Sequence, residues 1–415
     1  MIFEIYIWIL SFVSVFMAVL WIMVNYAVRF YKTPEPILKN YPLVTIAVPA
    51  WNEENTIIPT LRCILDQNYP ERNIEVIVVD DKSKDKTNYL VKDFISKNKS
   101  FNIKLINHKK NTGKAGALNS ALRVAKGEFF WVYDADSFAS RDLLRNLVKR
   151  FYEPENKDVA AVVAITLIKN DGNWVSKMQR LEYVMASFVR KLLGSVDTLH
   201  ITNALTLFKT ATIKKIGGFD VGNLTEDFEM AMKLRYNGFR IVMCENGNFH
   251  TNVPATIKRM WLQRVRWFRG FIHNNLKYKR MIMNKQFGLL GLFQIPVEIF
   301  FLLAVFTSVV IFGYHFINLL IDLGFQVYIQ RLALLDFSLP TFKYLILNIN
   351  WKITFPSLIV LFFGLYLYFA AHKYVGEKWK FYIPSLIYIF VYPLFRSMQW
   401  VHAFVLELGR AERKW

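Results

Sequence analysis

The sequence predicts an α/β domain, with a mostly parallel Rossmann-like sheet, inserted between an N-terminal transmembrane helix and a C-terminal transmembrane bundle. Long apolar runs occur only towards the two ends of the 415 residues. Between them, short β-branched runs alternate with segments of helical spacing, which is typical of right-handed βαβ units. Lys and Arg exceed Asp and Glu by 20.

The first apolar run is Ile5–Val24, which has twenty residues and no charge. A helix of about 20 such residues crosses a bilayer core. The alternative is a cleaved signal peptide, but residues 1–4 lack a basic region and no small-residue cleavage site follows. We therefore expect an anchor over residues 1–30. The cations that follow place the next domain in the cytoplasm; they are Arg29, Lys32 and Lys39.

Residues 40–252 are expected to form this cytoplasmic domain. Apolar, β-branched runs predict strands over residues 43–50, 74–81, 101–108 and 127–137. Helical spacing predicts helices over residues 55–65, 84–97 and 113–125. Ligands of such sheets bind beyond the carboxyl ends of the strands. The two cysteines, Cys63 and Cys244, form no CxxC motif, which fits a reducing compartment and predicts neither a disulfide framework nor a zinc site.

Acidic and amide side chains stand where the predicted strands end. The residues are Pro49, Asn52 and Glu53 after the first strand, Asp80 and Asp81 after the second, and Asp134 and Asp136 after the fourth. Five carboxylates at one sheet edge would raise one another's pKa, and a divalent cation or ligand donors would relieve this. The DxD pair of Asp134 and Asp136 suits Mg²⁺ or Mn²⁺. The alternative is that aspartate ends strands because it favours turns.

Two further motifs carry charge towards this edge. Lys114, in "NTGKAGALN", suits a diphosphate as a point charge, or is a solvated lysine at a helix start. In "TED", Thr225 is expected to cap a helix whose first turn holds Glu226 and Asp227. Two interpretations of this motif remain open. The acids stabilise the start of the helix, since acids favour helix N-termini. Alternatively, one of them faces a cleft as a general base.

Residues 253–286 are expected to form basic amphipathic helices at the membrane interface. They contain nine Lys or Arg and no acid, which suits a surface of anionic lipid. Gln263, Arg266 and Trp267 stand at i, i+3 and i+4, so they share one helix face, while Arg264 points elsewhere. Arg266 is suited to charge-assisted bonds with a diphosphate. Trp267 is suited to stacking on a sugar ring.

Residues 287–406 are expected to form a bundle of about three spans, followed by a basic tail over residues 407–415. The apolar runs are Phe287–Phe316, Ile353–Ala371 and Phe381–Leu406, the last broken by Pro393 and Arg396. Gln326–Asn350 is either a further span or an interfacial helix, which leaves the side of the C-terminus open. Four polar residues fall in or near these runs: Glu298, Asn318, Gln399 and His402. They either line a polar path through the bundle or join its helices by hydrogen bonds.

Six motifs occur in order between about residue 44 and residue 267: "VPAWNEE", "VIVVDDKSKDKT", "GKAGALN", "DADS", "TED" and "QRVRW". With the flanking spans, they resemble the processive, membrane-embedded family-2 glycosyltransferases. That group includes the poly-N-acetylglucosamine, hyaluronan, chitin and cellulose synthases, and the first two are the most similar. The resemblance implies a GT-A fold, a nucleotide-sugar donor (a UDP-sugar), a divalent metal, Mg²⁺ or Mn²⁺, and inversion at the anomeric carbon.

Roles follow from the resemblance motif by motif. Donor binding is assigned to Pro49, Asn52, Glu53, Asp80, Asp81, Lys114 and Asp134. Asp136 and Asp134 hold the metal, with Asp136 the more direct ligand. Asp227, grouped with Glu226, is the catalytic base. Gln263, Arg266 and Trp267 form the acceptor and diphosphate end. Asn203, in "ITNALTLFK" where many relatives have a glycine-rich turn, is expected to alter the acceptor pocket.

The expected function is polymerisation of an extracellular polysaccharide, with extrusion through the chain's own membrane bundle. The expected partners are a nucleotide sugar, a growing polysaccharide or lipid-linked acceptor, and membrane lipid, but no nucleic acid. The expected location is the plasma membrane. Two alternatives remain: transfer of a single sugar to a lipid-linked acceptor, and a non-catalytic sugar-binding or transport protein. The sugar, the product length and the oligomeric state are not predicted.

Overall fold

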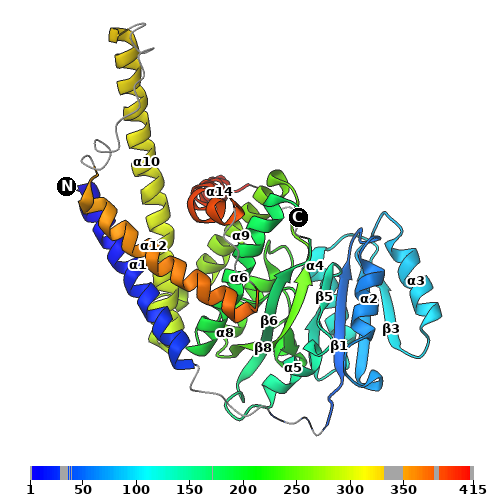
Figure 1. The fold of residues 1–415 in the computed structure, drawn as a ribbon. Coiled ribbons are helices and arrows are strands. Elements are labelled where there is room, and N and C mark those ends of the chain that lie inside the picture. The colour runs from blue at the N-terminus through cyan, green and yellow to red at the C-terminus, as the bar shows by residue number, and fades with distance from the viewer. Residues whose placement is uncertain are drawn as a thin grey trace. The chain divides into compact units, whose positions relative to one another are not determined.

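The computed structural model describes residues 2–28, 36, 38, 40–170, 172–330, 349–377 and 383–411. The chain divides into two compact units (Figure 1). Unit 1 comprises Met1–Ala27 and Val297–Ala370, and unit 2 comprises Val28–Pro296 and Ala371–Trp415. Arg29, Lys32, Lys39 and the last four residues of the tail lie outside the described residues.

Unit 1 is built from apolar helices. They are α1 (Ile2–Ala27), most of α10 (Ile295–Gln330) and most of α12 (Trp351–Val375). Large apolar side chains such as Phe12 and Val310 are more than two-thirds exposed, which suits lipid better than water. α1 and α10 are joined where the Tyr6 hydroxyl donates to the Ala304 carbonyl oxygen over 2.7 Å.

Three helices in the described part of the chain are long and apolar enough to cross a membrane: Phe3–Ala27, Leu290–Ile329 and Trp351–Val375. The second is longer than the predicted run and extends past Gln326, while residues 331–348 lie outside the described residues. The described part of the last apolar run is not among the three. It forms α13 (Ile383–Leu386), a π-helix (Ile387–Val391) and α14 (Tyr392–Leu408) within unit 2.

Unit 2 contains one sheet of eight strands in the order β3-β2-β1-β4-β7-β6-β8-β5. The strands are β1 (Val44–Ala50), β2 (Ile74–Asp80), β3 (Asn102–Asn107), β4 (Phe129–Val132), β5 (Ser137–Ala139), β6 (Val159–Ile168), β7 (Leu207–Lys209) and β8 (Arg240–Thr251). The half from β3 to β4 is parallel, as predicted. β7 runs antiparallel to both of its neighbours, and β5 runs antiparallel to β8, so the whole sheet is mixed.

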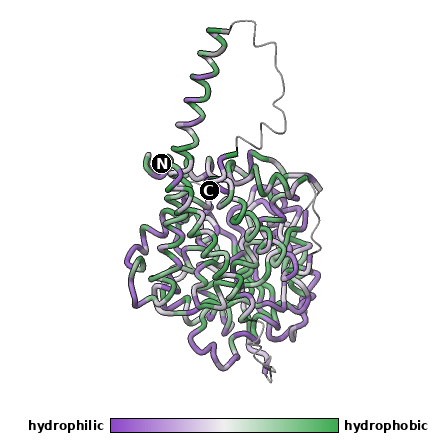
Figure 2. The backbone as a smooth tube through the Cα atoms, turned by 60° about the vertical axis from the view of Figure 1, so that its left-hand side comes forward, coloured by the Kyte–Doolittle hydropathy of each residue, from purple (hydrophilic) through white to green (hydrophobic). Residues whose placement is uncertain are grey.

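Helices cover both faces of this sheet (Figure 1), and every residue of β2 and β6 is buried. Such continuous apolar strands are typical of a sheet that is covered on both sides. The covering helices include α2 (Ile57–Leu65), α3 (Thr87–Lys97), α4 (Gly113–Val124), α5 (Leu143–Phe151) and α6 (Trp174–Ser195). Figure 2 shows hydrophilic residues along the outer turns of unit 2 and hydrophobic residues within it.

The predicted strand over residues 127–137 is in fact two strands. β4 ends at Val132, and the chain turns through Asp134 and Asp136 before β5 begins. The turn is closed by the Ser137 N–H, which donates to the Asp134 carbonyl oxygen over 3.1 Å. The two DxD carboxylates therefore stand in a turn at the edge of the sheet and not within a strand.

The helix that carries QRVRW, α9 (Ile257–Lys277), packs against two other helices of unit 2. α14 covers one side, where the rings of Phe268 and Trp400 stack with centroids 4.0 Å apart. On the other side, a Cβ added at Gly270 would lie 2.2 Å from the Thr225 hydroxyl oxygen. Only glycine permits this approach, which brings α9 against the start of α8 (Glu226–Tyr236).

Candidate active site

Lys114 joins two motifs that are far apart in the sequence. Its Nζ lies 2.6 Å from Asp134 Oδ1, in the DxD turn after β4. It also lies 3.0 Å from Glu226 Oε1, at the start of α8. Lys114 itself is in the first turn of α4. One ammonium group therefore brings "GKAGALN", "DADS" and "TED" to one place.

The acids at this place are short of compensating positive charge. Burial raises the pKa of Asp136 to about 7, and the nearby charges of Asp134 and Glu53 add to the effect. Burial also raises the pKa of Asp134, although Lys114 and Arg266 oppose it. The repulsion that the sequence predicts between strand-end carboxylates thus occurs at the DxD turn. Shifted pKa values of this kind are frequent at functional sites.

The DxD turn has the chemistry of an Mg²⁺ or Mn²⁺ site that is completed by phosphate. Within the described ranges, no group of three or more His, Cys, Asp or Glu residues is arranged to hold a metal ion. Asp134 and Asp136 are both partly exposed, and they offer two carboxylates side by side. Mg²⁺ is commonly bound by one or two carboxylates together with waters and substrate phosphates. The pair fits that mode of binding and does not fit a site made of protein ligands alone.

Asp81 uses its carboxylate to hold the start of α4. It accepts hydrogen bonds from the backbone N–H groups of Thr112 and Gly113, the latter over 2.7 Å. His108 Nδ1 lies 2.7 Å from Asp81 Oδ1. Asp81 is therefore a buried, fully bonded carboxylate, and its side chain sets the position of the loop that precedes Lys114.

The other predicted donor residues after β1 and β2 also shape loops. Asn52 has a positive φ of 56°, and its side-chain oxygen accepts from the Lys84 N–H over 2.8 Å. Asp80 accepts from the Ser83 N–H and the Asn88 amide. Pro49 lies within β1, and Glu53 accepts from the Thr56 hydroxyl. The bond between Asn52 and Lys84 joins the loop after β1 to the loop after β2, and the others hold each loop locally.

Glu226 and Asp227 are adjacent but have different environments. Glu226 is buried and pairs with Lys114. Asp227 is partly exposed, and its Oδ1 accepts from the Phe228 N–H over 2.8 Å. Burial raises the pKa of Asp227 to about 6, and the neighbouring Glu226 adds to the rise. Asp227 is therefore the carboxylate of this pair that is suited to exchange a proton near neutral pH.

The predicted cap by the Thr225 side chain does not form. Thr225 stands at the N-cap position of α8, but its side chain makes no capping hydrogen bond. Its hydroxyl accepts instead from the Asn274 amide on α9, over 3.2 Å. This bond and the close approach at Gly270 fix the start of α8 against α9.

Arg266 lies close to the acids. Its Nη1 donates to the Leu224 carbonyl oxygen over 3.4 Å, just before "TED". Its positive charge opposes the rise in pKa of both Asp134 and Asp227. The Arg266 guanidinium of QRVRW therefore lies near Asp134 of "DADS" and Asp227 of "TED".

Arg264, which the sequence predicted to point elsewhere, contacts Gln263 and Trp267 of QRVRW. Its guanidinium carbon lies 4.1 Å from the centre of the Trp267 ring, and its Nη1 donates to Gln263 Oε1. Arg264 is completely buried, and its Nη2 lies 2.7 Å from Glu182 Oε2 on α6. Tyr392 of α14 donates to the same oxygen. No sequence signal pairs Glu182 with Arg264, because the two residues are far apart in the chain.

Asn203 is turned into the protein. Its side-chain amide donates to the Ala164 carbonyl oxygen over 2.7 Å and to the Thr166 hydroxyl, both on β6. It therefore shapes the turn before β7. A residue that the sequence did not single out, Arg190 on α6, has buried Nε and Nη1 atoms with no hydrogen-bond partner in the described structure. The ionisable groups near it include Asp227 and Tyr183.

The four polar residues expected in the membrane bundle belong to different units. Glu298 and Asn318 lie on the part of α10 that belongs to unit 1. Gln399 and His402 lie on α14 in unit 2, where His402 Nδ1 accepts from Trp261 Nε1 on α9 over 2.9 Å. His402 thus makes a hydrogen bond between helices, which is the second of the two roles that the sequence allowed.

Comparison with known families identifies the part of the chain that carries Lys114 and the DxD turn. Residues 45–217 match the family model "Glycosyl transferase family 2". The chain carries a family-2 glycosyltransferase domain. That match covers β1 to β7 and includes the DxD turn and Lys114. The family-2 glycosyltransferase domain that the motifs predicted is thereby confirmed.

Curated relatives extend the similarity beyond this domain. A poly-β-1,6-N-acetyl-D-glucosamine synthase of Staphylococcus epidermidis is 29% identical over 276 residues, which are 63% of this chain and 64% of that protein. One from Staphylococcus aureus (strain MSSA476) is 30% identical over 278 residues, again 63% and 64%. The chain thus matches somewhat less than two thirds of the length of these relatives. The predicted resemblance to poly-N-acetylglucosamine synthases is confirmed.

A solved structure supports the fold. The mannosyltransferase PcManGT from Pyrobaculum calidifontis, in complex with GDP-Man and Mn²⁺, aligns with a TM-score of 0.58 and 21% sequence identity. The alignment covers 99% of both chains. This likeness confirms the predicted GT-A fold of the glycosyltransferase domain, between an N-terminal apolar helix and a C-terminal helical region.

Proposed function

We propose that the chain is a processive, inverting glycosyltransferase that adds sugars from a UDP-sugar to a growing extracellular polysaccharide. The observation that carries the proposal is the position of Lys114, 2.6 Å from Asp134 and 3.0 Å from Glu226. Arg266 faces the same acids. A donor diphosphate, a catalytic base and the QRVRW helix would then meet at one site.

Asp227 is proposed as the base that takes the proton from the attacking hydroxyl of the acceptor. With a pKa of about 6, it is mostly ionised at neutral pH yet basic enough to accept a proton. General-base steps of this kind contribute roughly 10²- to 10⁴-fold to the rate. Glu226 is not proposed as the base, because its carboxylate forms an ion pair with Lys114 and holds that side chain in place.

Lys114 and Arg266 are proposed to bind the nucleoside diphosphate as it leaves. Lys114 now balances two carboxylates, so an arriving phosphate would compete with them for its ammonium group. Fixed cations at a developing negative charge stabilise the transition state. A bound Mg²⁺ or Mn²⁺, held by Asp134 and Asp136, would neutralise phosphate charge there.

Trp267 is proposed as the platform for the acceptor sugar. The Arg264 guanidinium lies over one face of its indole ring, so the opposite face remains for a sugar ring. The buried Glu182–Arg264 pair holds this arrangement in place before any sugar arrives. A preorganised platform of this kind reduces the cost of ordering the acceptor.

The relatives named above make poly-β-1,6-N-acetyl-D-glucosamine, so UDP-N-acetylglucosamine is the first donor to test. The three candidate spans support an integral membrane protein. We place it in the plasma membrane with the glycosyltransferase domain in the cytoplasm, and we propose that the product leaves through the chain's own helices.

The test is incubation of the purified full chain with UDP-N-acetylglucosamine and Mg²⁺ or Mn²⁺, followed by a gel of the product. A ladder or smear is expected. One added sugar on a lipid-linked acceptor would favour single transfer and overturn polymerisation. In reconstituted vesicles with donor outside, polymer that is protected inside is expected, and polymer found only outside would overturn extrusion.

A further inference from the structure

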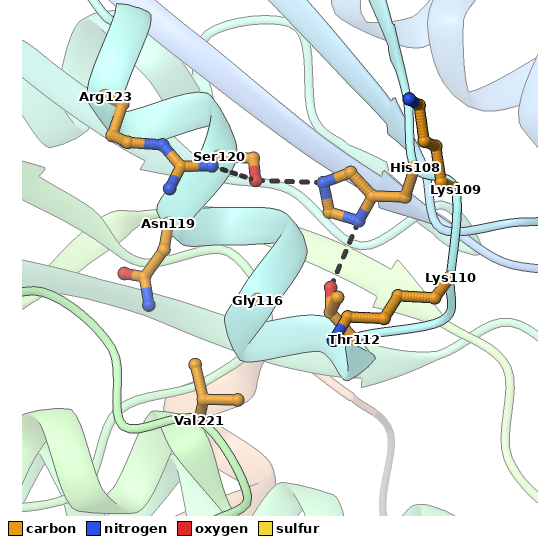
Figure 3. Close-up of a pocket in the computed structure, with 9 residues that line it drawn as sticks. All are labelled: His108, Lys109, Lys110, Thr112, Gly116, Asn119, Ser120, Arg123 and Val221. Atoms are coloured by element: carbon orange, nitrogen blue, oxygen red, sulfur yellow. Dashed lines mark hydrogen bonds between the residues drawn. The ribbon is translucent and has the colours of Figure 1, made fainter.

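A hollow lies along α4, the helix whose first turn carries Lys114 (Figure 3). Its volume is about 400 Å³, within the range of roughly 300–1,000 Å³ that is usual for small-molecule sites. Nine residues line it: His108, Lys109, Lys110, Thr112, Gly116, Asn119, Ser120, Arg123 and Val221. Five of these belong to α4 or its N-cap and recur on one side of the helix, as their spacing requires.

The charge of this hollow is positive and uncompensated. Lys109, Lys110 and Arg123 are cations, and none of the nine lining residues is acidic. All three are exposed and make no ion pair among the described residues. Asp220, the neighbour of Val221 in the sequence, is paired with Lys277 at 2.6 Å. An anionic ligand would therefore be attracted to the hollow.

Three hydrogen bonds run from the wall of the hollow to Asp81. Arg123 Nη2 donates to Ser120 Oγ over 2.8 Å, and Ser120 Oγ lies 2.9 Å from His108 Nε2. His108 Nδ1 lies 2.7 Å from Asp81 Oδ1. Because an ionised carboxylate only accepts, the proton of a neutral His108 ring is on Nδ1, and Nε2 accepts from the Ser120 hydroxyl. The chain is thus directional, from Arg123 to Asp81.

The Thr112 hydroxyl makes a second link between the hollow and Asp81. It donates to Asp81 Oδ1 over 3.0 Å and lies 3.1 Å from His108 Nδ1. A Cβ added at Gly116 would lie 2.3 Å from this hydroxyl oxygen, so a glycine is required for Thr112 to occupy its place. Figure 3 shows His108 between Thr112 on one side and Ser120 on the other.

We propose that this hollow binds a small phosphorylated molecule, and that its binding changes the affinity of the donor site through Arg123, Ser120, His108 and Asp81. Phosphate suits the hollow because three cations there can make charge-assisted hydrogen bonds to it together. Asp81 holds the loop that precedes Lys114, so a shift in its bonds reaches the donor site. The coupling rests on the proposed donor site, whereas the binding of phosphate does not.

Binding is tested by calorimetry on the purified full chain, with inorganic pyrophosphate as the probe and a chelator present. The wild type is expected to bind it, and Lys110→Ala with Arg123→Ala is expected to weaken the affinity at least tenfold. Lys92→Ala, an exposed cation on α3 outside the hollow, is the matched control and should bind as the wild type does. Equal affinity in all three proteins would overturn the site.

A further arm separates a soluble phosphate from a lipid headgroup. Binding to vesicles that contain phosphatidylglycerol is compared for the wild type and the double variant. Vesicle binding should be the same for both proteins. If the double variant lost vesicle binding but kept its affinity for pyrophosphate, the assignment to a soluble ligand would be wrong.

Coupling is tested by measuring UDP affinity with and without pyrophosphate. A change of roughly fivefold is expected in the wild type, since allosteric couplings usually begin at about that size. Ser120→Ala breaks the chain but keeps the three cations, so it should bind pyrophosphate and show no change in UDP affinity. A change that persists in Ser120→Ala would indicate simple competition and overturn the coupling. If no protein bound UDP, the proposed function would fail while the pyrophosphate result stood.

Discussion

Replacement of Glu182 by Gln tests whether the QRVRW helix is held by a buried charge. The change keeps the shape of the side chain and removes its charge from the 2.7 Å contact with Arg264. Burial alone would raise the pKa of Glu182, but Arg264 and Arg396 outweigh it and hold this pKa below its ordinary value. The pair therefore stabilises the fold at neutral pH, and its contribution is lost only as the pH falls through this lowered value.

The expected cost follows from burial. Two unit charges 2.7 Å apart attract by about 6 kcal/mol at an effective dielectric constant of 20, and by about 1.5 kcal/mol in water. Desolvation offsets much of the larger figure. Removing one partner of a buried pair nevertheless costs about 3–5 kcal/mol, because the other charge is left unpaired. We expect about 3 kcal/mol for Glu182→Gln, since Tyr392 remains a hydrogen-bonding neighbour.

The matched control is a surface pair with the same geometry. Asp93 and Lys97 on α3 also lie 2.7 Å apart, but their side chains are 40% and 70% exposed. Such pairs contribute about 0.5 kcal/mol or less. Urea unfolding of the two variants in detergent, followed by tryptophan fluorescence, compares Glu182→Gln with Asp93→Asn.

Activity gives a second measurement on the same variants. Because Arg264 orients Trp267 and Gln263, Glu182→Gln should raise the KM for the acceptor more than the KM for the donor. The double variant Glu182→Gln with Arg264→Met leaves no buried charge unpaired, since the other cation near Glu182, Arg396, has a side chain that is 42% exposed. It should recover stability but not activity. If Glu182→Gln were as stable and as active as Asp93→Asn, the role of this pair in the site would be refuted.

Three further changes test the carboxylates and the contact between helices. Asp227→Asn should lower kcat by roughly 10²- to 10⁴-fold yet leave donor binding intact in calorimetry. Because burial raises the pKa of Asp227 to about 6, kcat of the wild type should be half-maximal near pH 6 and fall about tenfold per unit below it; a flat profile from pH 7 to pH 5 would remove Asp227 from the mechanism. Asp136→Ala should abolish the part of donor binding that Mn²⁺ enhances, and indifference of the wild type to a chelator would contradict that role. Gly270→Ala places a Cβ 2.2 Å from the Thr225 hydroxyl oxygen, so thermal unfolding should show a loss of about 1–3 kcal/mol, whereas Gly313→Ala, with nothing within 4 Å, should show little change.

The first half of the sheet was predictable because its strands are β-branched or aromatic runs, and acids follow three of the four, namely β1, β2 and β4. β1, β2 and β3 lie within a residue or two of their predicted ranges, and so do α2 and α4. The second half was not predictable in the same way. β7 has three residues and runs antiparallel to both neighbours, so neither its length nor its direction leaves a periodic signal.

The sequence predicted individual residues of the candidate site, but it did not predict which of them interact with one another. Strand ends and helix spacing indicated Asp134, Asp227 and Arg266, since local patterns place those residues. The interactions of Lys114 with Glu226 and of Arg264 with Glu182 are long-range, and one sequence carries no record of them.

The long-range contacts of the last apolar run were likewise not predictable from the sequence. Its composition predicted a span over residues 381–406. The described part packs against α9, where His402 accepts from Trp261 and Glu407 lies 2.7 Å from Arg269. Polar residues that look costly in a span are satisfied by partners far away in the chain.

The central claim is that donor, base and acceptor platform share one site. A cryo-electron microscopy map of the full chain with UDP-N-acetylglucosamine and Mn²⁺ tests it most directly. The diphosphate should lie between Asp136, Lys114 and Arg266, with the anomeric carbon facing Asp227 and the free face of Trp267 beside it. Nucleotide density elsewhere on the chain, with these side chains far from it, would contradict the claim.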